Sequence, residues 1–168
     1  MEAGRQWYEI WVPQKLSTLS APRKIVFPDF ATSNVFAIET TGAFVGSSAG
    51  FGVPAADATD DDLWYLLFLL NSPLLEYVHK RHFGTSILAG RYRYWVRQIA
   101  DYPIPWPSAT VRRDLAKRAR DAAQTGIDEA DHLSRAVSAF PLSSDDRLTV
   151  CKEVAQWLSL AEARAGPR

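Results

Sequence analysis

Short apolar runs with the two-residue alternation of β-strands occupy the first third of the chain. Four runs of large aromatic and β-branched side chains predict strands: 7–12, 23–27, 35–39 and 43–47. The last two flank Thr40-Thr41-Gly42, which predicts that they pair with each other as a hairpin. The glycine-rich stretch 46–52 is expected to form a flexible turn. Residues 1–56 are therefore predicted to be rich in β-structure.

From residue 57 onward the apolar positions take the spacing of helices. Asp60 is placed to cap a first helix, whose leucines recur at three- and four-residue intervals. Ser72 and Pro73 predict a second helix, with serine as the cap and proline at the first helical position. Three more helices are expected: 108–125 closed by Gly126, 128–138, and a last helix capped by Ser144. The last helix is expected to bury Leu148, Val154, Trp157, Leu158 and Ala161.

Arginines alternate with bulky side chains between residues 91 and 97, which predicts an exposed strand with a basic face. The proline-rich run 103–107 ends this strand. The predicted fold class is α+β, with a small, twisted, mainly antiparallel sheet packed with helices and followed by a C-terminal helical segment. We expect one domain at 1–107 and a helical extension at 108–168, which packs on that domain or on a partner.

The charges balance overall but are unevenly distributed. The chain has 19 basic and 19 acidic residues, so its net charge gives no support for a polyanionic partner. From Tyr77 to Ala100, however, five lysines and arginines occur without an acidic residue. A surface of one sign attracts a polyanion whatever the total charge. This stretch therefore predicts either a nucleic-acid contact or a solvated basic face.

The common catalytic and metal-binding motifs are not found in the sequence. It lacks the Gly-x-Ser-x-Gly elbow of hydrolases, the phosphate loop of nucleotide-binding enzymes and the Asn/Asp-Pro-Pro-Tyr/Phe tetrapeptide of amino-methylating DNA methyltransferases. Pro28-Asp29 and Glu39 begin a nuclease signature, but Thr41 stands where that signature needs a lysine. His79 and His82 make half a zinc site, without a neighbouring cysteine or carboxylate. We therefore expect no catalytic residues, no metal site and no cofactor.

Five stretches occur in a distinctive order along residues 5–107. They are Arg5-Gln-Trp-Tyr8, Pro22-Arg-Lys-Ile-Val-Phe-Pro-Asp29, Phe36-Ala-Ile-Glu-Thr-Thr-Gly42 leading to Ser47-Ser48, Leu63-Trp-Tyr-Leu-Leu-Phe-Leu-Leu-Asn-Ser72 and Tyr102-Pro-Ile-Pro105. The Leu-Asn-Ser and Pro-Ile-Pro elements are the most specific pair. In order and spacing the set resembles the TaqI-like C-terminal specificity domain of adenine-N6 DNA methyltransferases and type II restriction-modification enzymes.

This resemblance implies a target-recognition domain that packs beside a methyltransferase core and contacts double-stranded DNA, mainly in the major groove. It also implies that the missing methyltransferase motifs belong to another segment or chain, so that the sequence is an excised domain, a remnant or a subunit acting in trans. The predicted function is DNA sequence recognition in a restriction-modification or DNA-methylation system. The expected partners are double-stranded DNA and an adenine-N6 methyltransferase or restriction subunit. The alternative is a protein-interaction subunit that binds DNA only when it is assembled with such a partner.

The DNA-contacting candidates are cationic side chains, most of them in 77–100, and hydroxyl groups in a small-residue loop. Arg91, Arg93 and Arg97 rank first because they share the predicted exposed strand, and arginine can form paired hydrogen bonds with guanine. Surface solubility is the alternative explanation for these three. The full set is Lys24, Ser47, Ser48, Lys80, Arg81, His82, Arg91, Arg93 and Arg97.

The sequence predicts a soluble, cytoplasmic protein. Its longest apolar run, 63–70, has eight residues, whereas a membrane-spanning helix needs about 20. The first residues contain no apolar signal core. The single cysteine, Cys151, cannot form a disulfide within the chain and is expected to be packed in the last helix.

Overall fold

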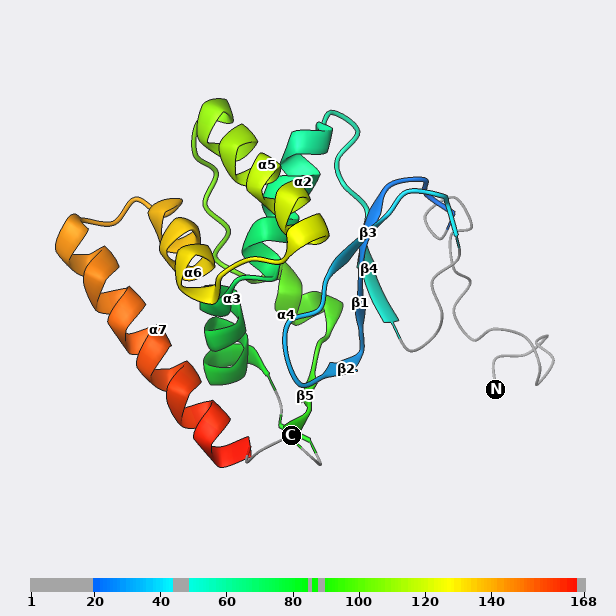
Figure 1. Ribbon diagram of the computed structural model, residues 1–168. Helices are drawn as coiled ribbons and strands as arrows, with labels where there is room; N and C mark the ends of the chain where they lie inside the picture. The colour runs from blue at the N-terminus through cyan, green and yellow to red at the C-terminus, as the bar shows by residue number, and fades with distance from the viewer. Residues whose placement is uncertain (1–19, 44–48, 85, 88–89, 166–168) are drawn as a thin grey trace, which may run out of the picture.

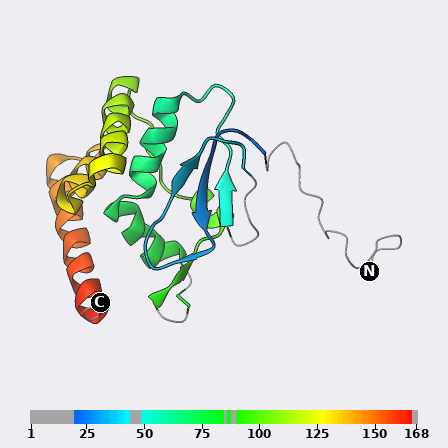
Figure 2. The same ribbon diagram turned by 45° about the vertical axis from the view of Figure 1, so that its right-hand side comes forward.

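The structure is a computed structural model that describes residues 20–43, 49–84, 86–87 and 90–165, with side chains described through Ala161. The predicted strand at 7–12 and the candidate residues Ser47 and Ser48 lie outside the described residues. Figures 1 and 2 show three layers: the strands, then α2 (Asp60–Leu70) and α3 (Pro73–Val78), then the helices after residue 108 on the far side. The α+β prediction, with a C-terminal helical part, is confirmed.

The central strand of the main sheet is β1 (Lys24–Pro28). It pairs antiparallel with β3 (Ala37–Glu39) on one side and with β4 (Ala49–Gly52) on the other. Most of the strand predicted at 43–47 lies outside the described residues, so its predicted hairpin with 35–39 stays a prediction; in the described residues β3 pairs with β1. β1 carries two buried core side chains, Ile25 and Phe27. In the central position its backbone groups have hydrogen-bonding partners along both edges.

The glycine-rich stretch is different from the prediction, since Ala49–Gly52 is a strand and not a flexible turn. Gly50 lies opposite Phe27 in the register of β1 and β4. A Cβ atom added at Gly50 would lie 2.3 Å from Cε2 of the Phe27 ring. Glycine at this position thus allows the aromatic ring to pack directly against the neighbouring backbone.

Thr59, and not Asp60, caps α2. The Thr59 side chain accepts a hydrogen bond from the Asp62 amide at 3.2 Å, and the Asp62 carboxylate accepts one from the Thr59 amide at 3.0 Å. This reciprocal capping box satisfies two amide groups that the helix itself leaves unpaired. The predicted start of α3 is confirmed, because Ser72 accepts from the Leu75 amide and Pro73 occupies the first turn.

Thr59→Ala is expected to lower the free energy of unfolding by about 1 kcal/mol, because it removes the hydroxyl half of the capping box. Urea denaturation measures the change. Thr110→Ala serves as the control, since Thr110 is an exposed residue in the first turn of α5 (Ala109–Thr125). An equal loss in both variants would show that the capping box contributes no specific stability.

The C-terminal helices pack on α2 and α3. α5 lies along α2, while α6 (Glu129–Ser138) and α7 (Ser144–Ala165) pack against α3 (Figure 1). The predicted bounds of α5 and the predicted cap of α6 are confirmed: Gly126 follows α5 with a φ of 78°, and Asp128 accepts from the Asp131 amide. Ser108 precedes α5 as predicted, but its side chain makes no capping hydrogen bond. One apolar cluster runs from the strands to α7. The boundary at residue 107 stays a prediction.

Two details of α7 differ from the prediction. Ser143, one residue earlier than expected, accepts the capping hydrogen bond from the Asp146 amide. Leu148 is 55% exposed and does not join the buried stripe, whereas Val154 is 1% exposed and does. The buried side of α7 therefore lacks Leu148, which its sequence predicted to be buried.

Candidate nucleic-acid interface

The basic residues of 77–100 lie on or beside three short elements: η1 (His79–Phe83), β5 (Tyr92–Arg93), which Arg91 directly precedes, and α4 (Val96–Ala100). β5 pairs with β2 (Phe30–Ala31) to make a second, two-stranded sheet. Figure 1 shows β2 and β5 together at one end of the molecule, below the main sheet. This end carries the candidate interface.

Two asparagines fasten this end to the C-terminus of α2. The Asn71 side chain accepts from the Phe36 amide at 2.8 Å and donates to the Phe36 carbonyl at 2.9 Å. The Asn34 side chain donates to the Leu70 carbonyl at 2.6 Å and accepts from the Tyr94 hydroxyl at 2.9 Å. Asn71 thus holds the approach to β3, and Asn34 links α2 to the segment that follows β5. The Leu-Asn-Ser element has a structural role, as predicted for helix punctuation.

His79 packs against β5 and the residue that follows it. It is fully buried, its ring stacks on that of Tyr94 with centroids 4.0 Å apart, and Nε2 lies 3.1 Å from the Arg93 carbonyl oxygen. Burial lowers the pKa of His79 to about 4, so its imidazole is neutral near pH 7. Because a carbonyl only accepts, the Nε2 proton must be present, and the backbone of Arg93 is held by this hydrogen bond.

The guanidinium of Arg93 lies over two exposed aromatic rings, those of Phe30 and Trp95. Its central carbon is 5.0 Å from the centroid of Phe30 and 4.8 Å from that of Trp95. Phe30 is 42% exposed and Trp95 is 47% exposed. Asp29 approaches the Nη2 atom of Arg93 at 3.4 Å. The side chain is thereby held in place while part of it remains open to solvent.

The predicted exposed strand with a basic face is wrong beyond Arg93. β5 has two residues, and α4 begins at Val96, which places Arg97 on a helix. The chain turns because the Gln98 side chain accepts from the Trp95 amide and the Ile99 amide bonds to the Trp95 carbonyl. A helical turn at this point satisfies backbone groups that an unpaired edge strand would leave open.

The remaining basic candidates differ in exposure. Arg81, His82, Arg91 and Arg97 are exposed, and within the described part of the chain no carboxylate forms an ion pair with them. Lys80 is engaged, since its Nζ lies 2.6 Å from Glu76 and 5.4 Å from the ring of Tyr92. Four of the candidates are therefore open to a polyanion, and Lys80 is already neutralised.

Lys24 lies in the core and has no access to a DNA surface. Its side chain is 0% exposed, and Nζ lies 3.1 Å from Glu39 and 2.9 Å from the Ala21 carbonyl oxygen. A hydrogen bond from the Thr41 hydroxyl, together with Lys24, lowers the pKa of Glu39 to about 2. Glu39 thus holds the turn at Thr41 by accepting a hydrogen bond from the Thr41 amide. Asp29 is the other acid of the incomplete nuclease signature, and it forms an ion pair with Arg93.

Sequence reasoning missed the aromatic partners of Arg93. Trp95 belonged to the alternating stretch, but Phe30 is more than sixty residues away and no local signal connects the two. Only the pairing of β2 with β5 brings them to the same arginine. Among the residues that the structure describes there is no cluster of three or more histidine, cysteine or acidic side chains suited to a metal ion.

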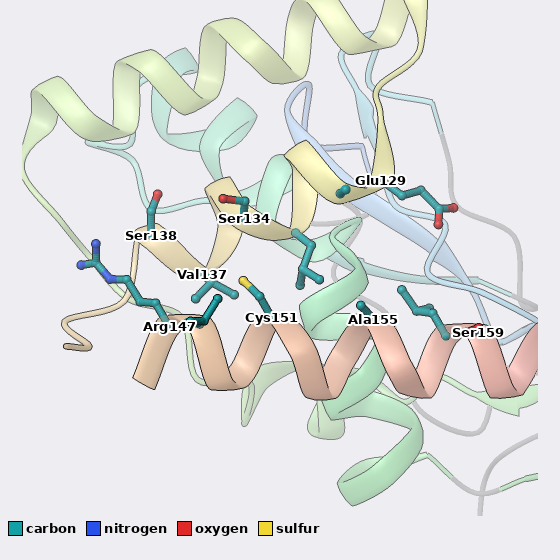
Figure 3. A pocket seen from close by; sticks show the side chains of 12 residues that line it. Glu129, Ser134, Val137, Ser138, Arg147, Cys151, Ala155 and Ser159 are labelled. Atoms are coloured by element: carbon teal, nitrogen blue, oxygen red, sulfur yellow. The ribbon is translucent and has the colours of Figure 1, made fainter. Parts of the chain in front are cut away.

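A second surface feature lies between α6 and α7. It is a mainly apolar groove of about 670 Å³, lined along its floor by Leu133, Val137, Cys151 and Ala155. Figure 3 shows Ser138 and Arg147 at one end of this groove and Glu129 and Ser159 at the other. Burial raises the pKa of the Cys151 thiol, which keeps it protonated and unreactive near pH 7.

None of the helices in the described part of the chain is both long enough and apolar enough to span a bilayer. No family model matches the sequence. The chain is similar to the type II methyltransferase M.BanIII of Aneurinibacillus aneurinilyticus, with 29% identity over 115 residues. The match includes 68% of this chain and 20% of that protein, so the chain spans about a fifth of the length of the relative. The similarity indicates that the chain is related to type II methyltransferases.

Proposed function

We propose that this chain is a DNA sequence-recognition module of a restriction-modification or DNA-methylation system. The methyl-transfer or cleavage chemistry would reside on another segment or another chain, an adenine-N6 methyltransferase or restriction subunit. The observation that carries the proposal is the match to a type II methyltransferase over a fifth of its length. The exposed cations around β5 support the proposal, because solvent-exposed arginines can bind phosphates and base edges.

Removing the positive charges around β5 tests the proposal. Replacing Arg91, Arg93 and Arg97 with alanine should weaken duplex binding and reduce the slope of log K against log salt by up to about 3, roughly one unit for each lost phosphate contact. Fluorescence anisotropy with a labelled duplex across a salt series measures both quantities. The measurement is made on the chain alone and with M.BanIII from which the matching fifth has been deleted.

The matched control removes three exposed cations from the helical side: Arg113→Ala, Lys117→Ala and Lys152→Ala. It changes the net charge by the same amount, so a general effect of charge would weaken binding equally in both variants. The proposal requires the β5 variant to lose more affinity than the control. Equal losses of affinity in the two variants would contradict the assignment of DNA binding to the arginines around β5.

The groove between α6 and α7 favours a second candidate function, docking of a methyltransferase subunit. Leu148 at its edge is 55% exposed, and exposed apolar side chains beside an apolar groove are typical of protein interfaces. In this case DNA contacts arise only in the assembly. Leu148→Glu should then abolish co-purification with the truncated M.BanIII, whereas Leu160→Glu, which is 52% exposed but does not line the groove, should not. Co-purification unaffected by Leu148→Glu would exclude this groove as the docking surface.

A further inference from the structure

The side chain of Arg93 is partly exposed to solvent, and neighbouring side chains also hold it in place. Phe30 and Trp95 contact it from β2 and from the residue before α4, and Asp29 takes one hydrogen bond from Nη2. The backbone of Arg93 is fixed as well, through its carbonyl at His79 and its pairing with Phe30. Its position is therefore determined before any ligand binds, although 39% of the side chain is exposed.

The hydrogen bonds already made leave donors free for a ligand. A guanidinium carries five N–H groups, and Asp29 occupies one of those on Nη2. Among the described residues no hydrogen bond reaches Nη1. Nη1 and Nη2 lie side by side at the outer end of the planar guanidinium, and at least one N–H on each is without a partner among the described residues. Two parallel donors of this kind match two adjacent acceptors in one plane.

We infer that Arg93 is a specificity-determining residue that recognises a guanine of double-stranded DNA, with Phe30 and Trp95 as the clamp that aims it. The inference rests on the proposed function. The O6 and N7 atoms of guanine are the adjacent coplanar acceptors that the major groove presents, and arginine is the side chain that most often pairs with them. A stacked arginine loses little conformational freedom when it binds, so the clamp increases the discrimination that the contact provides.

The exposed aromatic rings are part of this argument. Phe30 and Trp95 present apolar surface to solvent, and neither is needed to fill the core. Their common contact is the Arg93 guanidinium. Arg91 and Arg97 are exposed without such a clamp, which suits contacts to phosphates, where position matters less than charge. One of the three arginines is thus distinguished from its neighbours by its surroundings.

The test is selection from a randomised duplex library with three forms of the protein: wild type, Arg93→Lys and Arg91→Lys. Each is used alone and with the truncated M.BanIII. Wild type should enrich a motif that contains a guanine. Arg93→Lys keeps the charge but loses the planar fork, and should reduce the preference for guanine at one position on the order of 10- to 100-fold. Arg91→Lys should leave the motif unchanged.

Trp95→Leu provides a second variant, which removes one side of the clamp at an exposed site and leaves the arginine in place. It should weaken the same guanine preference without altering the other positions of the motif. An enriched motif that Arg93→Lys leaves intact would overturn the role of Arg93 while supporting DNA recognition by the chain. If wild type enriches no motif in either setting, the proposed function fails and the assignment of Arg93 fails with it.

Discussion

Asn71→Ala is expected to lower the free energy of unfolding by about 2–4 kcal/mol, one of the largest effects of a single polar substitution in this chain. The Asn71 amide makes two hydrogen bonds to the backbone of Phe36, at 2.8 and 2.9 Å. Alanine would leave the amide and the carbonyl of Phe36 without these partners, each at a cost of about 1–2 kcal/mol because the two hydrogen bonds are partly buried. Urea denaturation followed by circular dichroism measures the loss.

Gln124→Ala is the control for this prediction, because Gln124 is exposed near the end of α5 and should change stability by less than about 0.5 kcal/mol. Asn71→Ala should also weaken duplex binding only as far as it unfolds the protein. A stability change in Asn71→Ala as small as that of the control would mean that the backbone of Phe36 finds other partners, and that Asn71 does not fasten α2 to the strands.

Acidification from pH 7.5 to pH 5 is expected to reduce stability by about 2 kcal/mol through His79 alone. Its pKa is about 4 in the folded protein and about 6.5 in the unfolded chain. Between these values the unfolded state binds a proton that the folded state does not. The stabilising effect of the buried neutral ring is therefore complete above pH 6.5 and decreases as the pH falls toward 4. Burial lowers the pKa of His132 as well, which adds to the decrease.

His79→Phe tests this account, because phenylalanine keeps an aromatic ring beside Tyr94 but cannot be protonated. The variant should be less stable than wild type at pH 7.5, where it lacks the hydrogen bond to the Arg93 carbonyl. Its free energy of unfolding should vary less between pH 7.5 and 5, by about 2 kcal/mol. Denaturation curves at several pH values provide the comparison, with the exposed His82 replaced by phenylalanine as the control. Identical pH profiles for wild type and His79→Phe would contradict a depressed pKa.

Local sequence signals predicted the longer helices but not the five-residue α4, which was expected to be a strand. The serine, proline and glycine residues that start or end α3 and α5 act through their own backbone and side-chain chemistry, so their effect is visible without tertiary information. At the starts of α2 and α7 the choice of cap was wrong by one residue, because neighbouring polar residues offer equivalent oxygen acceptors. The α+β class followed from the change of apolar spacing near residue 57.

Strand pairing could not be predicted in the same way. β3 and β4 are near each other in sequence, yet both pair with β1, which precedes them in the chain. The central strand carries Ile25 and Phe27, which belong to the same buried apolar cluster as residues of α2 and α3 far along the chain, so the strand order involves contacts between distant segments. The burial of Lys24 follows from the same cause, since its ion pair with Glu39 exists only in the register of β1 and β3.

The candidate interface was predicted in part. The acid-free stretch pointed to a region with exposed cations, since Arg81, Arg91 and Arg97 are exposed in the structure. The sequence could not show that Arg93 differs from Arg91 and Arg97 in its surroundings. Asp29 and Phe30 contact Arg93 only because β2 pairs with β5. Residues that surround a surface side chain from separate segments leave no periodic signal in the sequence.

The ratio of two dissociation constants tests the central claim most directly. One is measured for a duplex that carries the enriched motif, and the other for a duplex of the same length and composition with the motif scrambled, at physiological salt. Sequence recognition predicts that the motif duplex binds at least about 10³-fold more tightly, for the chain alone or with the truncated M.BanIII. A ratio near one in both settings would contradict the proposal that this chain recognises a DNA sequence.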